Sequence, residues 1–167
     1  MQARRPMTSD RSHSRPASLR ALIALEAVFG IIGFASGVPL VYDPSGKTMG
    51  LSLDLLKRTP VDDFLLVGIF FMAFYGVLPL LASYGLMVKK RWRWTDVFNK
   101  WTGEYWGWTA SVAVGVILLL WIAFELLTMG FLAGSGGILQ VAMAGFGVVM
   151  IILATRPSVR ASMRLPP

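Results

Sequence analysis

The chain has 167 residues, of which 55% are hydrophobic, and its mean hydropathy is +0.62. The hydrophobic share exceeds that of soluble domains, and the mean hydropathy is correspondingly high. The composition therefore indicates an integral membrane protein. The absence of cysteine excludes disulfides, thiolate catalysis, iron–sulfur clusters and zinc–cysteine sites. His13 is the single histidine, and a lone histidine in a segment rich in Arg, Ser and Pro does not predict a metal site.

Four apolar runs are each long enough to cross a hydrocarbon core of roughly 30 Å, which takes about 20 helical residues. They cover residues 19–40, 64–88, 107–129 and 137–155. The sequence therefore predicts an all-α membrane protein, a four-transmembrane-helix bundle formed by residues 19–155. Small residues near the end of the first run resemble a signal-peptide cleavage site, but the length of the run favours a retained helix.

The 16 basic residues alternate between the two ends of this bundle. Four precede the first run and Arg20 lies at its start, five lie between the second and third, and three follow the fourth, whereas three lie in the remaining loops. By the positive-inside rule, this distribution predicts that both termini are in the cytoplasm and that the protein lies in the cytoplasmic (inner) membrane. Residues 1–18 are predicted to be a disordered basic cytoplasmic tail and residues 156–167 a second basic cytoplasmic tail.

The first helix carries two features of interest. Gly30, Gly33 and Gly37 allow close approach of another helix, from the same chain or from a second copy. Glu26 lies about two turns, roughly 10 Å, into the helix. An acid inside a membrane costs about 2.5–3.5 kcal/mol and is a functional hypothesis by default. In this respect the chain resembles the small multidrug-resistance carriers, whose embedded glutamate exchanges protons for cationic drugs.

The first connection begins with a turn signal. Asp43, Pro44, Ser45 and Gly46 occupy the four positions of a type I turn with the residues that each position favours. Ser52 is then expected to cap a short helix that lies at the membrane surface or covers the outer mouth of the bundle.

The second helix is predicted to begin with a capping sequence. Thr59 is the expected N-cap and Pro60 the first helical residue, with Asp62 and Asp63 near the positive end of the helix. The paired carboxylates could also bind a cation, but their capping role already accounts for them. Later in this helix, Pro79 is expected to produce a kink because proline removes a backbone hydrogen bond.

These motifs resemble those of a group of small, uncharacterised bacterial four-helix integral membrane proteins with an Asp-Pro-Ser-Gly-containing outer loop. The likeness extends over residues 33–153 and includes Ala-Ser-Tyr-Gly-Leu at residues 82–86 and the pair Trp121-Ile122. Val67 departs from it, since we expect proline before Gly68. The resemblance implies the fold and topology and implies no chemistry.

The second connection holds five of the six tryptophans. They are predicted to be interfacial anchors: Trp92, Trp94, Trp101, Trp106 and Trp108. A short interfacial helix is expected between Thr95 and Gly103, and the adjacent basic side chains should attract anionic lipid headgroups. Aromatic and basic residues also bind single-stranded nucleic acid. The flanking membrane helices favour lipid, so no nucleic-acid partner is expected.

The last two helices form a hairpin whose register can be counted from the glycine-rich turn. Glu125 and Gln140 should lie level, and a hydrogen bond between them would tie the hairpin together. This structural role is favoured over a transport or proton role for Glu125.

The chain shows no nucleophile–base pair, phosphate-binding glycine loop or metal-ligand cluster, so neither enzyme activity nor a cofactor is expected. The predicted function is that of a non-enzymatic accessory or interaction subunit, acting through helix–helix and lipid contacts with another membrane protein or as a homo-oligomer. The alternative is a small proton-coupled carrier or ligand-binding bundle centred on Glu26.

Overall fold

The computed structural model describes residues 15–89 and 93–165, apart from the side chains of Trp94 and Phe98. Four helical spans in these residues are long and apolar enough to cross a membrane. They are α1 (Ala17–Tyr42), a second span (Leu65–Val88), α5 (Trp106–Thr128) and α6 (Ser135–Thr155). Each span begins and ends within two residues of its predicted limits. The all-helical fold with four apolar spans is therefore confirmed.

Apolar side chains cover the outside of the bundle as well as its interior. Ile31, Leu120 and Ile138 are each more than half exposed. Hydrocarbon solvates such a surface, whereas water does not. The four spans thus suit a multi-pass membrane protein.

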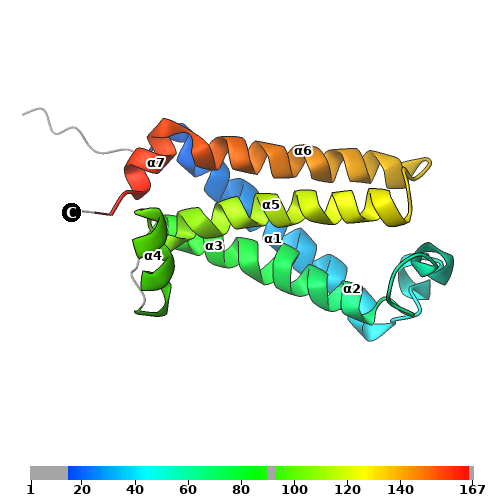
Figure 1. Ribbon diagram of the computed structural model, residues 1–167. Coiled ribbons are helices and arrows are strands. Elements are labelled where there is room, and N and C mark those ends of the chain that lie inside the picture. Colours follow the sequence, from blue (N-terminus) through cyan, green and yellow to red (C-terminus); the bar gives the residue numbers. More distant parts are fainter. Residues whose placement is uncertain (1–14, 90–92, 166–167) are drawn as a thin grey trace, which may run out of the picture.

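Successive spans run antiparallel, so both ends of the described chain lie at the same end of the bundle (Figure 1). We call this the terminal end, and the opposite end, which carries residues 43–64, the loop end. The bundle consists of two helical hairpins, α1 with the second span and α5 with α6. They pack together through α3 and α5 at the terminal end and diverge toward the loop end (Figure 1).

The second span changes its helical form in the middle. It comprises α2 (Leu65–Phe70), the π-helical segment η3 (Phe71–Val77) and α3 (Leu78–Val88). Pro79 has no N–H, and its ring conflicts with the carbonyl of Tyr75 one turn earlier. The wider π turn accommodates the proline ring, and it lies where the sequence predicts a distortion.

The glycines of α1 pack against this span. A β-carbon on Gly33 would lie 2.2 Å from the carbonyl oxygen of Tyr75, and a β-carbon on Gly37 would lie 2.7 Å from that of Gly68. Gly30 similarly faces the carbonyl of Gly76. The sequence allows this face of α1 to pack against a helix of the same chain or of a second copy. The structure shows packing within the same chain.

The turn at the start of the first connection forms as predicted. The N–H of Gly46 donates to the carbonyl of Asp43 at 3.0 Å, and Gly46 has a φ of +77°. The Asp43 carboxylate accepts hydrogen bonds of 2.6–3.2 Å from the N–H and hydroxyl groups of Ser45 and Thr48. The carbonyl of Pro44 accepts from the N–H of Phe64 at 2.9 Å, which ties the two ends of the loop together.

Two short 3₁₀ helices follow, η1 (Lys47–Met49) and η2 (Leu53–Leu56). The hydroxyl of Ser52 caps η2 by accepting the N–H of Asp54 at 3.2 Å. Leu56 and Phe64 are buried with Leu40 of α1, so the loop folds over the end of its own hairpin.

The predicted capping of the second helix, with Thr59 as N-cap and Pro60 as first helical residue, is wrong. The helix begins at Leu65, whose N–H donates to the Asp63 carboxylate at 2.9 Å. The hydroxyl of Thr59 instead donates to a carbonyl of η2. Asp62 is exposed. Burial of Phe64 and its bond to the loop hold residues 59–64 across the loop end, and this tertiary packing overrides the local capping signal.

The terminal end carries η4 (Arg93–Thr95) and two further short helices, α4 (Asp96–Thr102) and α7 (Pro157–Met163). α7 buries Val159 and Met163 against the bundle. The N–H of Tyr105 donates to the carbonyl of Met163 at 2.9 Å, within a bridge between the second connection and the C-terminal segment. Part of the predicted C-terminal tail is thus an ordered, packed element.

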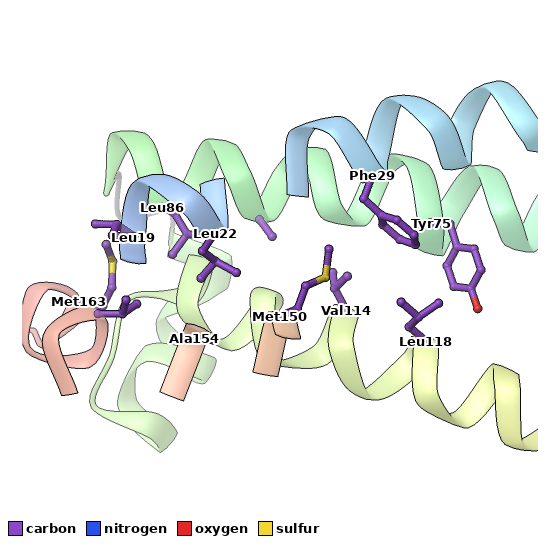
Figure 2. Close-up of a cluster of buried hydrophobic side chains, with 12 residues drawn as sticks. Leu19, Leu22, Phe29, Tyr75, Leu86, Val114, Leu118, Met150, Ala154 and Met163 are labelled. Atoms are coloured by element: carbon purple, nitrogen blue, oxygen red, sulfur yellow. The ribbon is translucent and has the colours of Figure 1, made fainter. Parts of the chain in front are cut away.

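The core runs from this end toward the middle of the bundle. Figure 2 shows Leu19 and Leu22 of α1 beside Leu86 and Met163, with Met150, Val114 and Leu118 continuing the cluster as far as Phe29 and Tyr75. The terminal half is densely packed, which leaves the divergent loop half as the place for a cavity.

Candidate functional site

A cavity of about 740 Å³ lies between the two hairpins toward the loop end, and we call it the cleft. Its walls come from α1, residues 49–64, the second span, α5 and α6. This volume falls in the range of about 300–1,000 Å³ that is usual for small-molecule sites. Such sites are mainly apolar with a few polar groups. The cleft fits this description, and its polar side chains are Ser36, Thr59, Tyr75, Glu125 and Gln140, with the indole N–H of Trp121.

Glu125 is the one charged side chain among the described residues that line the cleft. The indole Nε1 of Trp121 donates to its Oε1 at 2.5 Å, and Nε2 of Gln140 donates to its Oε2 at 3.5 Å. Gln140 also binds the turn between α5 and α6, through the carbonyl of Gly130 at 3.3 Å and the N–H of Leu132 at 3.1 Å. The predicted pairing of Glu125 with Gln140 is present, and Gln140 additionally holds the hairpin turn.

Tyr75 also lines the cleft, where its ring contacts Trp121. Its side chain is 1% exposed, and its hydroxyl has no hydrogen-bond partner among the described residues. The ring stacks on Phe71 with centroids 5.1 Å apart and lies edge-on to Trp121 at 6.4 Å. Figure 2 shows the hydroxyl directed toward α5. A buried donor without a partner is rare in native structures and indicates a missing partner.

Aromatic rings form a continuous wall around Tyr75. Trp121 stacks on Phe70 with centroids 4.3 Å apart. Phe29 of α1 contacts both Tyr75 at 5.4 Å and Phe146 of α6 at 5.3 Å. All of these residues line the cleft, so its inner part presents ring faces and edges to any occupant.

Glu26 lies elsewhere, in the packed terminal half. It is fully buried, and both carboxylate oxygens lack a hydrogen-bond partner among the described residues. Ser111 faces it, but the Ser111 hydroxyl donates to the carbonyl of Gly107 at 2.8 Å. Glu26 is not among the residues that line the cleft. Glu26 is therefore enclosed in the packed core, whereas Glu125 lies at the cleft.

The predicted tryptophan anchors have different environments. Trp92 and the side chain of Trp94 lie outside the described part of the chain. Trp101 is 88% exposed and remains available to an interface. Trp106 is buried against Gly85, and Trp108 donates its Nε1 hydrogen to the carbonyl of Ala154 at 2.8 Å. The anchor prediction is corrected for Trp106, which packs inside the bundle because Gly85 leaves room for its ring.

An ion pair at the terminal end could not be predicted from the sequence. Nε of Arg160 on α7 lies 3.5 Å from Oε1 of Glu104, which is 2% exposed. The Arg160 guanidinium also lies over the ring of Trp108, 5.3 Å from its centroid. These residues are far apart in the sequence and carry no periodic signal. The pair attaches α7 to the start of α5.

In residues 15–89 and 93–165, no three acidic or histidine side chains come together as a metal site would require. Comparisons of the chain with protein-family models, with curated proteins and with solved structures found no match. The resemblance to small bacterial four-helix proteins therefore stays a prediction. The cleft and its polar groups are the observations on which function can be argued.

Proposed function

We propose that this chain is a multi-pass membrane protein that binds a lipophilic small molecule in the cleft, without catalysing a reaction on it. The observation that carries the proposal is the cavity of about 740 Å³ with an apolar lining and a few convergent polar groups. The hairpins that form its walls diverge, so a molecule dissolved in the bilayer could enter between them.

We also propose an orientation with both termini in the cytoplasm and the cytoplasmic membrane as the location. The basic side chains support it, since those of the described residues beside the termini and in the second connection share the terminal end of the bundle. Trp101 and the exposed Lys100 would contact anionic headgroups there.

This proposal favours the ligand-binding alternative over an accessory or interaction subunit. The glycines of α1 that predicted an assembly surface pack against the second span of the same chain. It also moves the site from Glu26 to Glu125, because Glu125 lines the cavity and Glu26 is enclosed in the core. A homo-oligomer or a partner protein would have to use another surface.

Photolabelling in phosphatidylcholine nanodiscs tests the proposal. The probe is a long-chain alkyl alcohol that carries a diazirine in its chain, and mass spectrometry of peptides locates the adducts. Saturable labelling is expected at cleft residues such as Phe71 and Met143. Labelling confined to outward-facing residues such as Ile31 and Leu120, without saturation, would contradict a binding site.

Two variants of α6 provide the matched comparison. Ala142→Phe adds a ring to the cleft lining, whereas Val148→Phe adds the same ring at a half-exposed position outside the lining. Cleft adducts should disappear in the first variant and persist in the second. Equal labelling in both would show that the adducts do not report on the cleft.

A further inference from the structure

We propose that the preferred ligand of the cleft is a lipophilic ammonium, a molecule with an apolar body and a cationic head that pairs with Glu125. This inference rests on the proposed function and names the class of ligand. Three features support it: the charge in the cleft, the groups that surround Glu125, and the Tyr75 hydroxyl, which has no partner among the described residues.

The charge of the cleft is unbalanced. Glu125 contributes a carboxylate, and the described residues that line the cleft include no lysine, arginine or histidine. The basic side chains of the loop, Lys47, Lys57 and Arg58, are outside the lining. A carboxylate in an apolar cavity requires a countercharge or strong hydrogen bonds, and a cationic ligand supplies both.

The neighbours of Glu125 fix the position of its side chain. Both contacts to its oxygens come from N–H donors, the indole of Trp121 and the amide of Gln140. Gln140 is itself fixed by the hairpin turn, so the carboxylate is held in place before any ligand arrives.

The rings next to Glu125 provide the rest of a cation site. The indole of Trp121 contacts both the carboxylate and the ring of Tyr75, and Phe70 stacks on the same indole. The faces of aromatic rings attract ammonium groups, most strongly in desolvated sites. A carboxylate beside Trp, Tyr and Phe rings therefore selects an organic cation over a neutral molecule of the same shape.

The hydroxyl of Tyr75 is the second, independent observation. It is buried, belongs to a residue that lines the cleft, and has no partner among the described residues. A phenolic oxygen accepts hydrogen bonds as well as donating them. A primary ammonium has three N–H donors, enough to bind both the Glu125 carboxylate and the Tyr75 oxygen.

A pair of photoreactive probes tests the inference: a long-chain alkyl primary amine and the alcohol of equal length, each with the diazirine at the same carbon. Zwitterionic phosphatidylcholine nanodiscs prevent enrichment of the amine by lipid charge. The full chain should show half-saturation of cleft adducts at an amine concentration about tenfold lower than that of the alcohol. Equal half-saturation would overturn the inference and leave the proposed function standing, whereas failure of both probes to label the cleft saturably would overturn both.

Two variants assign the preference to particular groups. Glu125→Gln keeps the shape of the side chain and one oxygen that accepts from an N–H donor, removes the charge, and should abolish the preference for the amine while alcohol labelling continues. Tyr75→Phe removes an oxygen that has no hydrogen-bond partner in the described part of the chain, so the fold should persist, and the amine should bind severalfold more weakly. An amine preference that survives Glu125→Gln would overturn the assignment to Glu125.

Discussion

The α-carbon of Gly33 lies against the backbone of Tyr75, so closely that a β-carbon at position 33 would come within 2.2 Å of the Tyr75 carbonyl oxygen. The contact joins α1 to the π-helical turn that Pro79 imposes, and the side chain of the same Tyr75 lines the cleft. The packing of the first hairpin and the shape of the cleft therefore both depend on Tyr75.

Gly33→Ala should destabilise the fold, because the clash is with backbone and cannot be relieved by a rotamer change. We expect a loss of about 1–3 kcal/mol or more in the free energy of unfolding, measured by thermal unfolding in detergent. Gly145→Ala is the matched control, since a β-carbon there meets no atom within 4 Å. Equal stability of the two variants would show that the helices do not approach as closely as described.

Arg160→Met should loosen α7, because it leaves the buried carboxylate of Glu104 without its cation at 3.5 Å. Removing one partner of a buried polar pair costs about 1–3 kcal/mol. Unfolding in increasing SDS measures the change. The double variant with Glu104→Gln should recover part of the loss, and additive losses in the double variant would count against a direct pair.

Asp43 should make the first loop sensitive to acid. Hydrogen bonds from Ser45 first, then from Thr48, lower the pKa of Asp43 from its usual 3.8 to about 2. Because the pKa is depressed in the folded state, the contribution to stability is present above the unfolded pKa and is lost as the pH falls from about 4 to about 2.

Hydrogen exchange at the Thr48 amide, whose N–H donates to Asp43 at 2.9 Å, measures this directly. Protection should fall over that pH window, and Asp43→Asn should lower it already at neutral pH. The exposed Asp62 gives the control variant, Asp62→Asn, which should leave exchange unchanged. A pH-independent protection factor in the unmodified chain would contradict the role of Asp43.

Glu26→Met should stabilise the protein, because both oxygens of this buried carboxyl group lack hydrogen-bond partners among the described residues. Replacing an unpartnered polar group with an apolar one of similar length should gain about 1–2 kcal/mol. Glu26→Gln retains a polar head and should gain little. If both variants instead lost stability, the carboxyl group would have a structural partner that this account lacks.

The sequence predicts the spans because their length and hydropathy are properties of continuous segments. It also predicts that Glu125 and Gln140 meet, since a hairpin with a short turn fixes the register of its two helices. The type I turn at Asp43 follows in the same way from local residue preferences.

Other features depend on packing between distant segments. The cleft arises from divergence of two hairpins, and no local pattern encodes that angle. Thr59 and Pro60 carry a capping signal that burial of Phe64 overrides. In the sequence Tyr75 has the pattern of an ordinary core aromatic, and only the structure shows that its hydroxyl lacks a partner in residues 15–89 and 93–165. Such residues require the tertiary structure.

The central claim is that the cleft holds a lipophilic molecule, and native mass spectrometry of the protein extracted gently from its own membrane tests it most directly. A bound species of lipid-like mass should accompany the unmodified chain and Val148→Phe but be absent from Ala142→Phe. Identical spectra for all three proteins would contradict the claim, because a phenyl ring in the wall of the cleft should prevent a ligand from binding there.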